Sequence, residues 1–180
     1  MKKTILALVA AILCCGMQAQ EHLDYNGVPI DGSMASCMKA LRKQGFKPKS
    51  KDGDNHYMRG KFYGDEVEMF IATTAVSQTA YLFVVSYPAA SMWSTAKSRY
   101  EYAKMRLSVL YNEPTNVVEK FEFPYTEDDG LRAVEYGKCL YISTWSMSKG
   151  EVSLTISKDA RVQVFYTDKA NMALAGKEAN

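Results

Sequence analysis

The chain has 180 residues, a length that suits one domain of ordinary size. Hydrophobic residues make up 47% and charged residues 23% of the sequence, which is close to the average for soluble globular proteins. This composition excludes a disordered tail, a collagen-like repeat and a coiled-coil rod. With 22 basic and 20 acidic residues the formal net charge is only +2, so the charge balance does not favour nucleic-acid binding.

Residues 1–20 have the composition of a secretory signal peptide. Two lysines form a positive n-region, residues 5–15 form an apolar h-region, and small residues lead to a cleavage site after Ala19 or Gln20. The apolar run of about 11 residues is too short to cross a bilayer, which needs about 20. No later apolar stretch is long enough either. We therefore expect an exported protein, periplasmic or extracellular, that does not span a membrane.

The four cysteines leave two questions open. Cys14 or Cys15 could carry a lipid anchor, although neither follows the leucine and small residues of a lipobox. The mature chain, formally neutral without the two leader lysines, keeps only Cys37 and Cys139. In an oxidising compartment these could form one disulfide, worth on the order of 4 kcal/mol for a loop of about 100 residues. The alternative is two separately buried thiols.

The first part of the mature chain predicts one helix followed by strands. Apolar residues at helical spacing predict a helix over 34–44, with Ser33 as its N-cap and Gly45 as its stop. Alternating or continuous apolar runs then predict strands over 57–63, 67–71 and 81–87.

The second part repeats this order on a larger scale. A single apolar stripe predicts a long helix over 91–111, capped by Ser91. The stripe consists of Trp93, Ala96, Tyr100, Ala103, Leu107 and Leu110. Strands are predicted over 117–123, 131–136, 139–145, 152–156 and 162–166, followed by a short helix from Asp168 onward.

Helices and strands are thus segregated rather than alternating, which predicts an α+β fold with a mostly antiparallel sheet. No Gly/Ser-rich or Pro-rich linker divides the chain, so residues 21–180 are expected to form one domain. We expect two helix-plus-antiparallel-meander units in it, with the long helix over 91–111 packed on the sheet.

Residues for nucleophilic or metal-dependent catalysis are sparse. The two histidines are His22, near the mature N-terminus, and His56, in a turn, and neither accompanies a nucleophile motif. Two distant cysteines and two histidines do not make a zinc site. Asp52, Asp54 and His56 alternate as calcium-loop ligands do, but the glycine and the closing glutamate of such a loop are missing. We therefore expect no catalytic residue, no metal and no cofactor.

Carboxylates provide an enzymatic alternative, because a pair of acids can hydrolyse a glycoside. Glu119 and Glu122, however, are an odd number of residues apart and cannot share one face of a strand. Asp128 and Asp129 are typical of a turn. A small carboxylate-dependent hydrolase is the alternative to a binding protein.

A basic segment is the strongest candidate for a binding site. Its members, in a stretch without acids, are Lys39, Arg42, Lys43, Lys47, Lys49 and Lys51. Such a stretch can bind an anionic glycan, a lipid headgroup or an acidic protein surface. The alternative is a solvated helix end and loop. Near predicted strand ends, Tyr57, Tyr63 and Tyr125 are the tyrosines expected to be exposed, where they could contact a carbohydrate or a protein.

Several short motifs resemble those of small exported proteins of uncharacterised function from Bacteroidetes. The motifs are Tyr25-Asn-Gly-Val-Pro-Ile-Asp-Gly32, Leu41-Arg-Lys-Gln-Gly-Phe46, Gly60-Lys-Phe-Tyr-Gly64 and Tyr111-Asn-Glu-Pro114. The doubled helix-plus-meander pattern is similar to β-lactamase-inhibitor-like folds, a likeness of fold that assigns no functional residue. Since no catalytic constellation is present, we expect a non-catalytic binding or inhibitor-like module of the cell envelope. A structural envelope component is a further alternative, and the expected partner is an envelope protein, an anionic glycan or a lipid.

Overall fold

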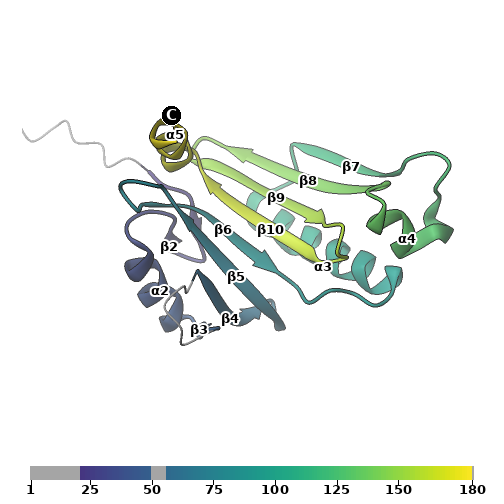
Figure 1. Cartoon of the computed structure of the whole chain (residues 1–180), viewed down its shortest axis with the longest axis horizontal. Helices are drawn as coiled ribbons and strands as arrows, with labels where there is room; N and C mark the ends of the chain where they lie inside the picture. Colours follow the sequence, from purple (N-terminus) through teal and green to yellow (C-terminus); the bar gives the residue numbers. More distant parts are fainter. Residues whose placement is uncertain (1–20, 50–55, 180) are drawn as a thin grey trace, which may run out of the picture.

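An eight-stranded antiparallel sheet forms the centre of the molecule, in a computed structural model that describes residues 21–49 and 56–179 (Figure 1). The strand order is β3-β4-β5-β6-β10-β9-β8-β7. The first half comprises β3 (Lys47–Pro48), β4 (Tyr57–Phe62), β5 (Asp65–Thr73) and β6 (Ala80–Ser86). The second half comprises β7 (Asn116–Phe121), β8 (Cys139–Met147), β9 (Gly150–Ile156) and β10 (Val162–Asp168). Each half is a meander preceded by a helix, and the halves join where β6 pairs with β10.

Helices cover one face of this sheet. The helix α2 (Met34–Lys43) packs with the first half, beside the small hairpin of β1 (Asp24–Tyr25) and β2 (Val28–Pro29). The longer helix α3 (Trp93–Tyr111) runs behind the sheet in Figure 1 and contacts β9 and β10. At one end of the strands, α5 (Lys169–Glu178) contacts β6, β9 and β10. The architecture is the expected α+β fold with two helix-plus-meander units.

Strand alternation builds the core on the helix side. Because successive side chains point to opposite faces, one set of opposed residues lines up across β4, β5, β6, β10 and β9. This set, each member fully buried, is Met58, Met69, Val85, Val164 and Leu154. The core residues of both halves belong to one continuous hydrophobic cluster.

The short helix α2 begins and ends as predicted. At its N-terminus the Ser33 Oγ accepts a hydrogen bond from the Ser36 amide at 3.3 Å. At its C-terminus Gly45 adopts a left-handed φ of 91°, which turns the chain back toward the sheet. The ring of Phe46 then lies directly on Gly60 of β4, where a Cβ would stand 2.4 Å from a ring carbon. The glycine therefore permits close packing between the helix and the sheet.

Asp168 joins the two ends of the described chain. Its buried carboxylate caps α5 by accepting from the Asn171 amide at 2.8 Å, as the predicted helix start implies. The other oxygen accepts from the Leu23 amide, also at 2.8 Å, and His22 Nδ1 lies 3.2 Å from the carboxylate. These contacts fix the segment before β1 against the start of α5.

The strand predicted over 131–136 is wrong, because these residues lie in α4 (Gly130–Glu135) and the turn that follows it. The preceding turn η1 (Glu127–Asp129) forms a capping box with Thr126, which favours a helical start. Ala133 and Val134 pack into the core from α4. A short apolar run does not distinguish a strand from a helical turn by its periodicity, which explains the error.

The long helix also differs from its prediction at both ends. It begins at Trp93, and its N-cap is Met92 rather than Ser91, with no side-chain cap bond. Leu110, expected on the buried stripe, is 55% exposed. A stripe with steps of three and four residues averages 3.5 per turn, whereas a straight helix has 3.6, so the stripe drifts by about 20° per heptad. By Leu110 this drift has carried the side chain off the core.

The cysteines are two separate buried thiols, so the alternative of a Cys37–Cys139 disulfide does not hold in this structure. Cys37 lies on α2 under the first half, and its thiol donates to the Asp31 carbonyl at 3.3 Å. Cys139 begins β8 in the second half. The two residues belong to different units of the fold. Burial raises the pKa of both thiols, that of Cys139 to about 11.

Candidate binding site

The face of the sheet turned away from α3, called here the open face, is the face toward the viewer in Figure 1. Directly opposed residues of neighbouring strands point to the same side, so register defines which side chains lie on this face. One row crosses it from β4 to β7. The row consists of Tyr57, Phe70, Val84, Phe165, Ser153, Thr144 and Asn116.

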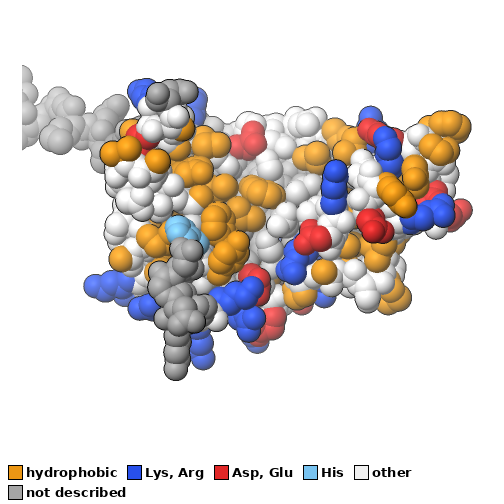
Figure 2. Space-filling view, viewed as in Figure 1, with side chains coloured by type: hydrophobic (Ala, Val, Ile, Leu, Met, Phe, Trp, Pro, Cys, Tyr) orange, Lys and Arg blue, Asp and Glu red, His pale blue; other side chains and the backbone are white. Residues whose placement is uncertain are grey.

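The two ends of this row differ in chemistry. In the first half and at the junction, neighbouring open-face residues form an apolar patch, which we define as Phe70, Ala72, Leu82, Val84 and Phe165. In the same two rows, β9 and β8 carry Ser153 and Thr144, then Glu151 and Ser146. Figure 2 shows hydrophobic side chains gathered over β5, β6 and β10 and a mostly uncharged polar surface beside them. Both phenylalanines are half-buried, and Tyr57, 46% exposed, lies next to the patch with its ring centroid 5.1 Å from that of Phe70.

Two adjoining hollows open beside the apolar patch. Their volumes are about 320 and 300 Å³, and both are lined by Glu68 of β5 and Arg161 at the start of β10. Arg59 and Glu66 line the first hollow, while Lys49 and Asp159 line the second. We call these six charged residues the charged hollow. They come from the end of β3, from β4 and β5, and from the β9–β10 hairpin, so the sheet brings distant parts of the sequence together.

Ion pairs organise the charged hollow. Lys49 Nζ lies 2.8 Å from one oxygen of Glu68, and Arg59 Nε lies 3.5 Å from the other. The hydrogen bond from Lys49, followed by the charges of Arg59 and Arg161, lowers the pKa of Glu68. On the other side Arg161 Nε donates to Asp159 at 2.8 Å. Both carboxylates are thus ionised at neutral pH, and three cations surround them.

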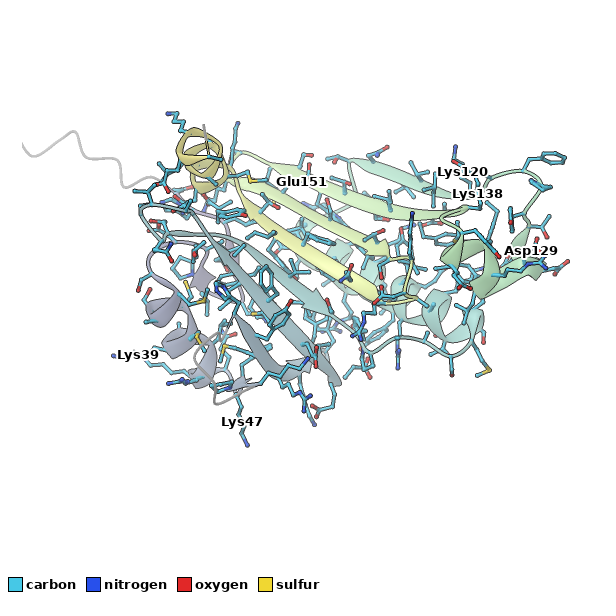
Figure 3. All side chains as sticks on the ribbon, viewed as in Figure 1. Lys39, Lys47, Lys120, Asp129, Lys138 and Glu151 are labelled. Atoms are coloured by element: carbon cyan, nitrogen blue, oxygen red, sulfur yellow. The ribbon has the colours of Figure 1, made fainter. Side chains whose placement is uncertain are left out.

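The predicted basic segment is divided by the fold. Lys39, Arg42 and Lys43 are exposed on α2, away from the hollow. Lys47 lies opposite Arg59 on the edge strand β3, and Figure 3 shows Lys39 and Lys47 pointing outward at separate places. Only Lys49 enters the charged hollow, and Lys51 lies outside the described residues. The segment is therefore not one continuous cationic surface.

The other candidates from the sequence are also dispersed. Of the three tyrosines, Tyr57 is exposed on the open face, whereas Tyr63 is half-buried beneath the Arg106 guanidinium, 4.7 Å from its centroid. Tyr125 is half-buried, with its ring centroid 6.1 Å from that of Tyr136. His56 Nδ1 lies 3.1 Å from the Ile71 carbonyl, and the two aspartates of the calcium hypothesis lie outside the described residues.

The carboxylate pair considered for hydrolysis is separated by the sheet, as its odd spacing predicts. Glu119 faces α3 and contacts Lys104 at 2.6 Å. Glu122 contacts Lys138 at 3.0 Å, and Figure 3 places Lys138 with Lys120 at the far end of the sheet from Lys47. Glu119 and Glu122 each pair with a lysine rather than with each other.

Sequence reasoning missed most of the site. Arg59 and Glu68 face each other across the β4–β5 hairpin, Arg161 stands far from both in the chain, and none of the three belongs to a motif. One signal was present in β5, where Phe70 lies two residues from Glu68 and therefore on the same face of the strand. The buried Met69 lies on the opposite face. An aromatic residue in phase with a charged one marks an apolar group on the outer face of a strand.

No protein-family model, curated protein or solved structure matches the chain. Within residues 21–49 and 56–179, no group of three or more His, Cys, Asp and Glu side chains could hold a metal ion. In the same ranges no helix combines the length and the apolar character needed to cross a membrane.

Proposed function

We propose that the protein is an exported, non-catalytic binding module of the cell envelope that recognises its partner through the open face. The observation that carries this proposal is the apolar patch, with two half-buried phenylalanines, beside the charged hollow on a sheet face turned away from α3. A partly accessible apolar patch bordered by polar and charged groups is suited to an interaction surface. Export is supported by the leader-like composition of residues 1–20.

The electrostatics of the charged hollow favour binding over catalysis. A general acid or base works best when its pKa lies near the working pH. The pKa of Glu68 is instead lowered by Lys49, and the pKa of Asp159 is lowered by its hydrogen bond from Ser157. Both carboxylates are therefore suited to hold charged groups in place rather than to exchange protons at neutral pH.

Affinity capture from envelope fractions tests the proposal. The chain would be expressed with its own leader, purified and used as bait, beside Phe165→Lys on the open face. The matched control is Val109→Lys on the outer surface of α3, where the side chain is 77% exposed. We expect the control to retain the partners of the unaltered chain and Phe165→Lys to lose them. Equal capture by all three baits would contradict the role of the open face.

An activity screen on the same purified proteins tests the hydrolase alternative. Turnover by the unaltered chain that disappears in Glu68→Gln would replace the binding proposal with a carboxylate-dependent reaction at this site.

A further inference from the structure

The charged groups of the open face are arranged in rows parallel to the row of phenylalanines. Register places Arg59 and Glu68 in the row next to Tyr57 and Phe70, with Arg59 two residues after Tyr57 and Glu68 two residues before Phe70. Arg161, the residue before β10, stands four residues before Phe165 and in the row beyond. At about 3.4 Å per residue, the two guanidinium-bearing positions begin about 7 and 14 Å from the aromatic row.

Among residues 21–49 and 56–179, basic side chains outnumber carboxylates in this part of the face. The bases are Lys47, Lys49, Arg59, Lys61 and Arg161, and the carboxylates are Glu66, Glu68 and Asp159. Glu66 is itself near Lys61, at 4.0 Å. The carboxylates stand among the bases rather than apart from them, so the surface carries separate points of positive charge instead of a uniform cationic field.

Both arginines keep hydrogen-bond donors accessible to the hollow of about 320 Å³ that they line. Arg59 Nε lies 3.5 Å from the Glu68 carboxylate, and the Arg59 side chain is 62% exposed. Arg161 Nε donates to the Asp159 carboxylate, while Arg161 Nη1 lies 3.5 Å from the Tyr87 carbonyl. A guanidinium presents planar, paired donors that match a carboxylate better than any other common protein group.

On these observations, and resting on the proposed function, we infer that the open face binds an extended polypeptide segment in which an apolar residue is followed by acidic residues at the second and fourth positions. In an extended chain the side chains at i, i+2 and i+4 lie on one face at a spacing of about 7 Å. Measured along the strands, this spacing matches the distance from the aromatic row to the rows of Arg59 and Arg161. The two arginines stand three strands apart across the sheet, and their side chains line the same hollow over the strands between them. The apolar side chain packs on Phe70 and Phe165, and the acids reach Arg59 and Arg161.

A polypeptide fits this face better than an anionic membrane. A lipid surface presents a dense sheet of negative charge, which the interspersed Glu66, Glu68 and Asp159 would repel. A peptide with discrete acids can meet each arginine at the donors that its paired carboxylate does not use.

Synthetic peptides provide the probe. The first is a ten-residue peptide, blocked at both ends, that repeats Phe-Ser-Glu-Ser-Glu; in the second, Gln replaces every Glu, and in the third, Lys does. Binding to the full chain purified with its own leader is measured by fluorescence anisotropy at two salt concentrations. We expect the Glu peptide to bind about tenfold or more tightly than the Gln peptide, because each arginine adds a charge-assisted bond. The affinity should fall as salt rises.

Variants separate this inference from the function on which it rests. Arg59→Gln and Arg161→Gln should each weaken the Glu peptide about tenfold and leave the Gln peptide unchanged, whereas Val109→Lys should alter neither. Equal binding of the Glu and Gln peptides, no binding of any peptide, or binding to phosphatidylglycerol vesicles in preference to the peptides would overturn the inference. If envelope capture still depends on Phe165 in those cases, the proposed function stands and only the partner chemistry is wrong.

Discussion

The two halves of the sheet are alike on the side that faces the helices and different on the open face. Each half is a helix followed by a four-stranded meander, and the halves meet at the opposed pair of Val84 and Phe165. Counting outward from this pair, the first half carries an aromatic ring at the positions where the second half carries a hydroxyl. The corresponding positions are Phe70 and Ser153, then Tyr57 and Thr144.

This difference shows what the fold requires and what it leaves free. Large apolar side chains on the helix side are needed in both halves, because they form the shared core. Along this one row, small hydroxyl residues serve the second half, whose other open-face positions include the apolar Leu140 and Ile142. The row itself therefore does not need the aromatic rings of the first half. Under the proposed function, these rings serve binding.

Close packing at a glycine should produce the largest effects, and they should differ between the halves. In the second half, a Cβ on Gly150 would stand 2.1 Å from the Thr167 carbonyl oxygen, a backbone atom that cannot rotate away. In the first half, a Cβ on Gly60 meets only the ring of Phe46. We expect Gly150→Ala to lower the free energy of unfolding by about 3 kcal/mol or more and Gly60→Ala by about 1–3 kcal/mol, measured by urea denaturation.

The double variant Gly60→Ala with Phe46→Leu checks the assigned cause. It should lose less stability than the sum of the two single changes, because the smaller side chain makes room for the new methyl group. Strict additivity would show that the ring of Phe46 is not what limits position 60.

The stability of the fold should respond differently when each of two buried tyrosines loses its hydroxyl group. In the second half, the Tyr100 hydroxyl is 2.7 Å from the Ser143 hydroxyl, and both residues are fully buried. Tyr100→Phe should lower the free energy of unfolding by about 1–3 kcal/mol, since it leaves Ser143 unpaired. The Tyr87 hydroxyl of the first half is buried and has no hydrogen-bond partner among residues 21–49 and 56–179. Tyr87→Phe should therefore be neutral or stabilising.

Adding Ser143→Ala to Tyr100→Phe removes the unpaired hydroxyl and should recover part of the loss, measured in the same denaturation series. A large loss of stability in Tyr87→Phe would contradict the account of that half.

The smallest effects concern two exposed ion pairs, one in each half. Hydrogen bonds from Lys49 and from Lys138 lower the pKa values of Glu68 and Glu122 respectively. A carboxylate whose pKa is lower in the folded state stabilises the fold above its unfolded pKa, and this contribution is lost as the pH falls through the folded pKa. NMR titration should thus find that the pKa of each glutamate lies below about 4.3, the ordinary pKa of a glutamate side chain.

A matched pair of variants assigns these shifts. Lys49→Met should raise the pKa of Glu68 alone, and Lys138→Met should raise that of Glu122 alone. Of the two, only Lys49→Met should change the affinity for the acidic peptide, because only Lys49 belongs to the charged hollow. An equal effect of both variants on that affinity would remove the distinction between the halves.

The helix-plus-meander order could be predicted from the sequence because apolar spacing records which residues face the core. Met38 and Leu41 on α2, or Val162 and Val164 on β10, repeat at the period of their own element. Strand order could not be predicted in this way, because the pairing of β6 with β10 joins residues that are far apart in the chain. No local pattern encodes that pairing.

The candidate site depends on this long-range pairing and was therefore largely beyond prediction. Arg161 follows a hairpin turn, and only the pairing of β10 with β6 and of β6 with β5 brings it to the same hollow as Glu68. Phe165 lies in an apolar run, and the sequence does not say which face of a strand the helices cover. Lys49 was identified as part of a basic segment, yet its role comes from its contact with Glu68 rather than from the lysines around it.

Site-specific photocrosslinking in intact cells that express the protein tests the central claim most directly. A benzoyl-phenylalanine replaces Phe165 on the open face in the first variant. It replaces Ser153, on the open face of the neighbouring strand β9, in the second variant, and Val109 on α3 in the third. The account predicts a discrete crosslinked partner from position 165, less from position 153 and none from position 109. Crosslinks of equal yield from all three positions, or from position 109 alone, would contradict it.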